Sequence, residues 1–118
     1  MNFVIHKNNT YWGTVYHIIT SDGKGCIEIS LDNNEPNTAY LSGLSVIPEV
    51  RHNGIGTALI KEAEQIAENN EIDKICLSVE KINDSLLRYY QNLNYDLIDE
   101  DDDYFYLEKQ LNNLYIRR

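Results

Sequence analysis

Residues 41–67 constrain the fold of this 118-residue chain more than any other stretch. They begin with an apolar, β-favouring run, turn at Pro48, and pass through a small glycine-bearing corner at residues 51–56. Beyond the corner, apolar residues recur with the spacing of one face of an α-helix, at Ile55, Ala58, Leu59, Ala63, Ile66 and Ala67. The sequence therefore predicts a strand, a glycine corner and a helix in direct succession.

Such a succession is suited to binding an anion. The first N–H groups of a helix have no partner within it, and the helix dipole adds about half a positive charge there. Gly54 and Gly56 carry no Cβ, so a phosphate can approach their backbone closely. The corner is therefore predicted to be a phosphate site.

The segments before this stretch predict an antiparallel meander without a long helix. Residues 2–6 are a short apolar start, and residues 7–10 have the composition of a turn. Residues 13–20 and 26–31 have strand patterns, and a hairpin signal lies between them.

A β-α-β unit is predicted next. Asn69 and Asn70 end the helical pattern, because asparagine tolerates the left-handed conformation found at helix ends. Residues 74–80 alternate apolar and polar side chains, which predicts a strand. Because a helix joins this strand to the first one, the two are expected to be parallel, with a right-handed crossover.

The last third of the chain predicts a second helix and a hairpin. Asn83 or Asp84 can cap the helix, and Asn94 can serve as the left-handed residue after it. Two strand-like runs follow around the acidic loop at residues 99–103, and the tail at residues 112–118 is expected to fray or to pack.

Composition narrows the class of partner. A formal net charge of −9 argues against nucleic acid, whose phosphates need a basic face. It fits a cationic partner such as an amine, although solubility explains it equally well. No apolar run approaches a membrane span and no leader pattern opens the chain, so one cytoplasmic domain over residues 1–118 is expected. Cys26 and Cys76 lack metal-ligand spacing, so buried free thiols and no metal are expected.

Three phosphate motifs compete for the glycine corner. The spacing and the lysine of a P-loop are both missing. A dinucleotide fingerprint is weakened by Leu59 at its last position, although Glu80 lies at a suitable distance for the acidic residue. The remaining pattern is R-x-x-G-x-G, from Arg51 to Gly56.

Preceded by Val46-Ile47-Pro48-Glu49-Val50, this pattern resembles the acetyl-CoA pyrophosphate loop of the GNAT superfamily of N-acetyltransferases. The family's second signature is a strand, an Asn, a Tyr seven residues later and then a Gly-aromatic pair. The sequence matches it with Val79, Asn83, Tyr90 and Asn94-Tyr95, in which Asn94 replaces the usual Gly. The two signatures in register are a specific match.

The resemblance implies a fold and a reaction. The fold is the α/β acyl-CoA N-acyltransferase (GNAT) fold, a mixed, mostly antiparallel sheet with a splayed parallel strand pair and two main helices. The implied reaction transfers an acetyl group from acetyl-CoA, as cosubstrate, to a primary amine. The acceptor is expected to be a small molecule or the Lys or N-terminal amine of a peptide.

It also implies roles for particular residues. The backbone amide of Leu44 would stabilise the oxyanion, and Tyr90 would protonate the departing thiolate as general acid. Asn83 would contact acetyl-CoA from the second helix. The other implied binding residues, for the pantetheine arm and then the pyrophosphate, are Leu44, Ser45, Val46, Arg51, His52, Asn53, Gly54, Ile55, Gly56 and Thr57.

The chain departs from the family pattern on the acceptor side. The two strand positions that often carry a catalytic Glu hold Tyr40 and Ser78, which leaves Glu80 or Glu28 as candidates for a relayed base. Residues 7–13 leave no room for the two helices that usually follow the first strand. Either the acceptor cleft is open, or a second subunit closes it in a homodimer.

Two other functions are compatible with the sequence. One is a non-catalytic acyl-CoA-binding or protein-interaction module on the same fold. The other is a phosphate- or nucleotide-binding domain unrelated to CoA, which requires the register of Asn83 and Tyr90 to be accidental.

Overall fold

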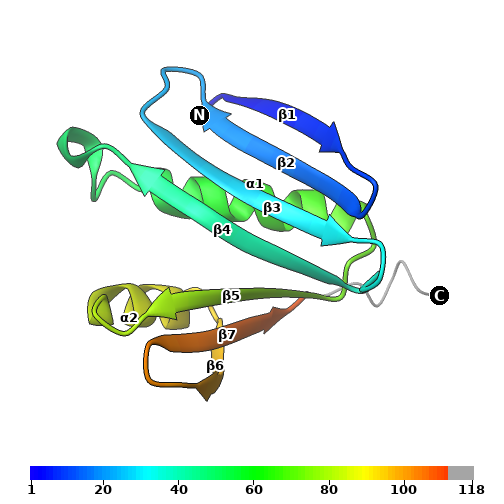
Figure 1. Cartoon of the computed structure of the whole chain (residues 1–118). Helices are drawn as coiled ribbons and strands as arrows, with labels where there is room; N and C mark the ends of the chain where they lie inside the picture. The colour runs from blue at the N-terminus through cyan, green and yellow to red at the C-terminus, as the bar shows by residue number, and fades with distance from the viewer. Residues whose placement is uncertain (112–118) are drawn as a thin grey trace.

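The computed structural model describes residues 1–111, so the expectation for the tail lies outside the described residues. Within these residues, seven strands and two α-helices follow one another (Figure 1). They are β1 (Phe3–Asn9), β2 (Gly13–Thr20), β3 (Gly25–Asp32), β4 (Thr38–Val46), α1 (Ile55–Asn69), β5 (Lys74–Glu80), α2 (Asp84–Asn92), β6 (Asp96–Glu100) and β7 (Tyr104–Gln110), with a 3₁₀ turn at Pro48–Val50.

The strands form one mixed sheet in the order β1-β2-β3-β4-β5-β7-β6. Only the central pair, β4 and β5, is parallel among the strands described, and every other neighbouring pair is antiparallel. The predicted architecture of a mostly antiparallel sheet with one parallel pair and two helices is confirmed.

Helix α1 packs on one face of β2, β3 and β4, behind the sheet in Figure 1. Its apolar face supplies Leu59, Ile60 and Ala63, which are buried against Ile27 and Ile29 of β3. Alternate residues of the same strand, such as Glu28, face the other side of the sheet and stay partly exposed. The sheet therefore has a helix-covered face and an open face.

The parallel pair separates soon after it forms. Pairing joins Thr38 to Lys74, Ala39 to Ile75 and Tyr40 to Cys76, and the two strands then diverge (Figure 1). Beyond Tyr40, β4 therefore has no partner on its β5 side among the described strands. The predicted splay is confirmed.

A β-bulge interrupts β4 within this diverging part. Ser42 pairs with Glu28 and Ser45 pairs with Cys26, so two residues of β4, Gly43 and Leu44, oppose one residue of β3. Gly43 has a φ of 68°, a left-handed conformation that glycine adopts without a steric penalty.

Three local predictions were wrong. Residues 7–9 belong to β1 rather than to a turn, because pairing of Lys7 with Tyr16 and of Asn9 with Thr14 outweighs their polar composition. The left-handed residue after α1 is Glu71, with a φ of 59°, whereas Asn70 has a φ of −97°. Both cysteines are free as predicted, but they are half-buried because the side chains of their strand positions point to the open face.

The absence of helices between the first two strands is confirmed. A three-residue connection, residues 10–12, joins β1 to β2, and the amide of Thr10 donates to the carbonyl of Gly13 over 2.8 Å. Within residues 1–111, no helix has the length and apolar character that crossing a membrane requires.

Candidate functional site

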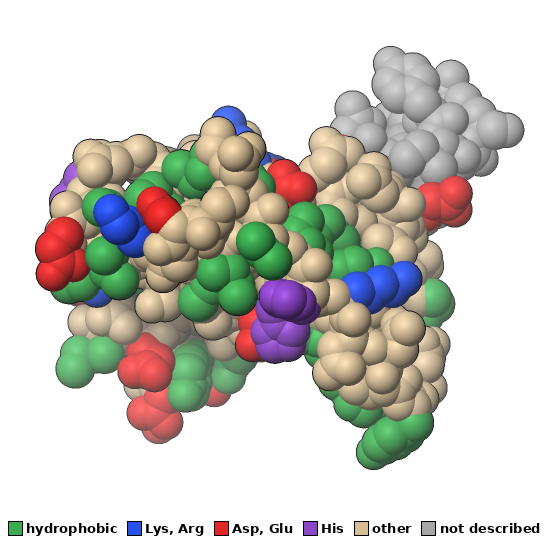
Figure 2. Space-filling view, turned by 90° about the horizontal axis from the view of Figure 1, so that it is seen from above, with side chains coloured by type: hydrophobic (Ala, Val, Ile, Leu, Met, Phe, Trp, Pro, Cys, Tyr) green, Lys and Arg blue, Asp and Glu red, His purple; other side chains and the backbone are tan. Residues whose placement is uncertain are grey.

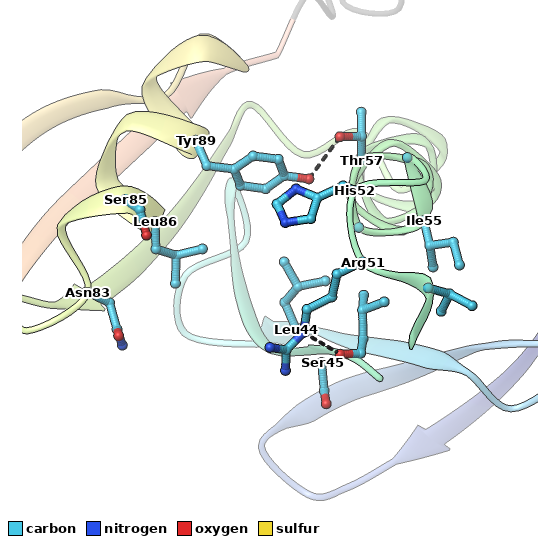
Figure 3. Close-up of a pocket in the computed structure, with 14 residues that line it drawn as sticks. Leu44, Ser45, Arg51, His52, Ile55, Thr57, Asn83, Ser85, Leu86 and Tyr89 are labelled. Carbon is cyan, nitrogen blue, oxygen red and sulfur yellow. Dashed lines mark hydrogen bonds between the residues drawn. The ribbon is translucent and has the colours of Figure 1, made fainter. Parts of the chain in front are cut away.

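A cleft of about 790 Å³ opens where β4 and β5 diverge (Figure 3). The end of β4, the loop before α1 with its first turn, and the start of α2 form its walls. Its lining residues are Leu44, Ser45, Val46, Val50, Arg51, His52, Gly54, Ile55, Gly56, Thr57, Asn83, Ser85, Leu86 and Tyr89. The cleft therefore brings together every predicted binding residue except Asn53, which is not among the residues that line it.

The glycine corner leaves the N-terminus of α1 open to a ligand. Gly54 is the N-cap residue with a φ of 80°, and no side chain caps the helix there. A Cβ at Gly54 would meet nothing within 4 Å, so the backbone borders open space. The first turn contains no acidic residue, so no negative charge opposes an anion. These features fit a pyrophosphate group.

Arg51 and His52 shape the loop before the helix. The Nε of Arg51 donates a hydrogen bond to the carbonyl of Val46 over 2.9 Å, which ties the loop to the end of β4. His52 has a φ of 69°, a conformation that costs a non-glycine residue about 1–2 kcal/mol. Both residues line the cleft, so a cation and an imidazole lie beside the predicted phosphate position (Figure 3).

Tyr89 is a cleft residue that the sequence reasoning missed. Its hydroxyl lies 2.8 Å from the hydroxyl of Thr57 and connects α2 to the first turn of α1 (Figure 3). A Cβ at Gly56 would come within 3.1 Å of the Tyr89 hydroxyl, so an alanine there would press on this hydroxyl unless it moved by a few tenths of an ångström. The helical period could have pointed to Tyr89, because successive residues of a helix are rotated by about 100° and Tyr89 and Tyr90 therefore face different directions.

Tyr90 does not line the cleft. Its side chain is 5% exposed and packs edge-on against Tyr89 and Tyr95, with ring centroids 5.5 Å apart in each case. Burial, reinforced by Tyr89, raises the pKa of Tyr90 well above its ordinary value. Its phenol therefore stays protonated at neutral pH, as a general acid must.

The carboxylates considered as bases lie elsewhere. Glu80 lines a separate hollow of about 370 Å³ together with Asp102 and Asp103. Glu28 lies on the open face of the sheet, 3.0 Å from the Nδ1 of His17. Neither carboxylate borders the cleft.

The residues at the strand positions that often carry a catalytic Glu, Tyr40 and Ser78, do not line the cleft either. The Tyr40 hydroxyl donates to Glu35 over 2.8 Å, and this bond, followed by burial, raises the pKa of Tyr40 to about 12. Ser78 is exposed. Among residues 1–111 no three His, Cys, Asp or Glu side chains gather into a possible metal site.

A second polar cluster joins the two halves of the molecule. Glu64 of α1 accepts a hydrogen bond from the Tyr95 hydroxyl over 2.8 Å and from the Lys109 ammonium of β7 over 3.0 Å. Tyr95 is 1% exposed, and the Lys109 ammonium lies 5.5 Å from its ring centroid. This cluster anchors α1 to the strands beyond the splay.

Comparison with known proteins gives one family. The model of the acetyltransferase (GNAT) family matches residues 4–95. Human N-alpha-acetyltransferase 30 is 34% identical over 73 residues, which are 60% of this chain and 20% of that protein. The N-terminal acetyltransferase complex ARD1 subunit homolog of Dictyostelium discoideum is 31% identical over 87 residues, which are 73% of this chain and 43% of that protein. This chain thus spans less than half the length of either relative.

A solved structure of an N-acetyltransferase has a similar fold. The PaiA N-acetyltransferase of Thermoplasma acidophilum, in complex with coenzyme A, superposes with a TM-score of 0.72 and 28% identity. The superposition covers 82% of this chain and 60% of that one.

Proposed function

Because this chain belongs to the acetyltransferase (GNAT) family, we propose that it transfers the acetyl group of acetyl-CoA to the α-amine of a peptide. The fold that the resemblance implied is confirmed by the family match over residues 4–95 and by the similarity to PaiA N-acetyltransferase.

The observation that carries the proposal is the uncapped glycine corner beside the unpaired edge of β4. The open N–H groups of α1 and the space at Gly54 suit the pyrophosphate, and Arg51 supplies a cation nearby. The unpaired β4 edge, with Leu44 in the bulge, offers backbone groups to an extended arm such as pantetheine. Both features line one cleft.

The choice of an α-amine rests on its acidity. With a pKa of about 7.8, roughly one α-amine in seven is neutral at pH 7, against about one Lys amine in two thousand. Neither Tyr40 nor Ser78 supplies the usual carboxylate, so an amine that needs less help to lose its proton is favoured. The curated relatives are named for acetylation of N-terminal amines, which supports the same acceptor class.

Two groups of this chain serve the chemical step. The amide of Leu44 stabilises the negative charge that develops on the thioester oxygen. Tyr90 is the proposed general acid for the departing thiolate, and burial, which raises its pKa, keeps the phenol protonated at neutral pH. Tyr89 keeps α2 against the first turn of α1.

The test measures binding and turnover separately. Acetyl-CoA is expected to raise the melting temperature, since it binds the folded state. Thiol release is then followed with a peptide carrying a free N-terminus and with the same peptide acetylated at its N-terminus. Release with the free peptide alone is expected, whereas equal release with both peptides would overturn the α-amine assignment.

The alternative function is a module that binds acyl-CoA without turnover. The exclusion of Tyr90 from the cleft lining favours it. A thermal shift with acetyl-CoA and no thiol release with any amine would support the module and overturn the transferase.

A further inference from the structure

A row of polar side chains crosses the open face of the sheet. The strand register places His6, His17, Glu28 and Ser42 side by side on β1, β2, β3 and β4. The Nδ1 of His17 lies 3.0 Å from the Oε1 of Glu28, and the two side chains are 41% and 42% exposed. In the space-filling view, histidine atoms form a purple patch beside an acidic side chain (Figure 2).

Glu28 lies against the bulge of β4. A Cβ at Gly43 would be 3.8 Å from Glu28 Cγ and 3.9 Å from Glu28 Cδ, so the carboxylate sits over the glycine. The next residue of β4 is Leu44, whose amide is the proposed oxyanion donor. The Glu28 carboxyl group therefore lies over β4, one residue from the amide that is the proposed oxyanion donor.

The open face is also the side from which an acceptor can arrive. Helix α1 packs on the opposite face of β2, β3 and β4, and α2 is joined to α1 through Tyr89 and Thr57. A nucleophile entering the gap between β4 and β5 from that side would have to pass the packed helices. The open face carries no helix of residues 1–111 over Glu28.

We infer that Glu28 is the general base of the reaction and that His17 positions its carboxylate. The inference rests on the proposed acetyl transfer, and neither residue borders the cleft that would hold the donor. His17 can donate its Nδ1–H to Glu28 as the charged imidazolium and as the neutral tautomer that is protonated at Nδ1. This hydrogen bond keeps the carboxylate oriented toward the bulge.

The step balances as a transfer of one acetyl group. The acceptor ammonium gives one proton to Glu28, which passes it to solvent. The nitrogen lone pair forms the C–N bond, the C–S bond breaks, and its electron pair leaves on the thiolate. The nitrogen loses a second proton and the thiolate gains one. The products are the amide, the free thiol and one proton.

Few other titratable groups face the pair. His6 of β1 lies opposite His17, Cys26 lies two positions along β3, and Tyr40 of β4 lies diagonally across from Glu28. Tyr40 is held by its hydrogen bond to Glu35. A pH dependence that changes with Glu28 is therefore attributable to that carboxylate once His6 has been replaced as a control.

The first experiment compares pH–rate profiles from pH 6 to 9, with a free N-terminal peptide as acceptor. Glu28→Gln is expected to lower the rate by up to about sevenfold at pH 7, because roughly one peptide α-amine in seven is already neutral there. The loss is expected to shrink above pH 8, where the peptide amine is already neutral. His17→Ala is expected to lose less, and His17→Asn to recover activity, because the Asn amide can replace the Nδ1–H donor.

The matched control is Glu68→Gln, which removes the same charge from α1 on the far side of the sheet, and His6→Asn is the second control. Both are expected to keep the wild-type profile. A Glu28→Gln rate that parallels wild type at every pH would overturn the assignment of the base. A wild-type enzyme without turnover would overturn the proposed function and this inference together.

A second measurement does not depend on turnover. Titration of the free peptide into the protein without acetyl-CoA is expected to shift the NMR signals of the Glu28 and Ser42 amides, whereas the N-acetylated peptide is expected to leave them unchanged. Glu28→Gln is expected to weaken binding of the free peptide several-fold. Equal shifts with both peptides would overturn a role for Glu28 in receiving the amine.

Discussion

The hydroxyls of Tyr89 and Thr57 lie 2.8 Å apart, so α2 and the first turn of α1 meet across the cleft. Thr57 is also a proposed phosphate ligand. Its hydroxyl therefore has two competing partners, one from the protein and one from the donor.

Tyr89→Phe is expected to leave acetyl-CoA affinity unchanged or to raise it, because Thr57 is then free to bind phosphate. The lost hydrogen bond should lower the free energy of unfolding by about 1 kcal/mol. Thr57→Val is expected to weaken acetyl-CoA binding, because a bond to a charged group is lost. Calorimetry and urea unfolding measure the two effects. A large loss of affinity in Tyr89→Phe would mean that Tyr89 itself binds the donor.

Gly54→Ala is expected to weaken acetyl-CoA binding more than it destabilises the fold. Its φ of 80° costs an alanine about 1 kcal/mol, and its Cβ would point into space that a ligand needs. Gly23→Ala is the matched control, because Gly23 has a φ of 74° and similar open space in the β2–β3 turn. Both variants should lose similar stability in urea. Equal acetyl-CoA affinity in the two would contradict the phosphate assignment.

Tyr90→Phe is expected to lower kcat about 100-fold without changing the affinity for acetyl-CoA. Because burial raises the pKa of Tyr90 above its ordinary value near 10, the acid form persists through pH 9. The pH profile of kcat for the wild type should therefore show no fall between pH 7 and 9 that comes from deprotonation of Tyr90. If Tyr90→Phe has the same kcat as wild type, the general acid is a residue other than Tyr90.

Glu64→Ala is expected to destabilise the protein by about 1.5–3 kcal/mol, because it removes the acceptor of the hydrogen bonds from Tyr95 and from Lys109 of β7. Glu100→Ala breaks the more exposed pair with Lys81 and should cost less than about 1 kcal/mol. Urea unfolding compares the two. Equal losses in the free energy of unfolding would show that the Glu64 cluster stabilises the fold no more than the exposed pair does.

The same cluster predicts a change of stability in alkali. Burial, and then Glu64, raise the pKa of Tyr95 in the folded state. The unfolded chain releases that proton near pH 10, so the stabilisation is complete below pH 10 and is lost as the pH rises above it. Wild type should lose stability between pH 9 and 11 more steeply than Tyr95→Phe does. Parallel curves would contradict this assignment.

The local pattern of the sequence was enough to predict the glycine corner and the helix that follows it, because these residues are contiguous in the chain. The register of Asn83 with Tyr90 came from the resemblance to the family. Asn94 was also predictable, because its φ of 73° is the conformation that helix ends require. Tertiary contacts decided the rest. Whether Tyr89 or Tyr90 faces the cleft depends on the rotation of α2 against Thr57, and His17 meets Glu28 only through strand register.

Residues 7–9 show the same limit at the level of secondary structure. Their polar side chains suit a turn in isolation, yet the backbone of β1 continues to pair with β2 through Asn9. Pairing energy, which depends on a partner elsewhere in the chain, outweighs local propensity there.

The three residue pairs between β4 and β5 have a consequence for the order of folding. The four strands from β1 to β4 are joined by short hairpin connections, so their contacts close short loops. The β4–β5 pairs close a longer loop, because the whole of α1 lies between Thr38 and Lys74. Long-range closure is the slower process because more chain entropy must be lost first. We expect amide protons of β2 and β3 to become protected early during refolding, and those of β5 and β7 to follow.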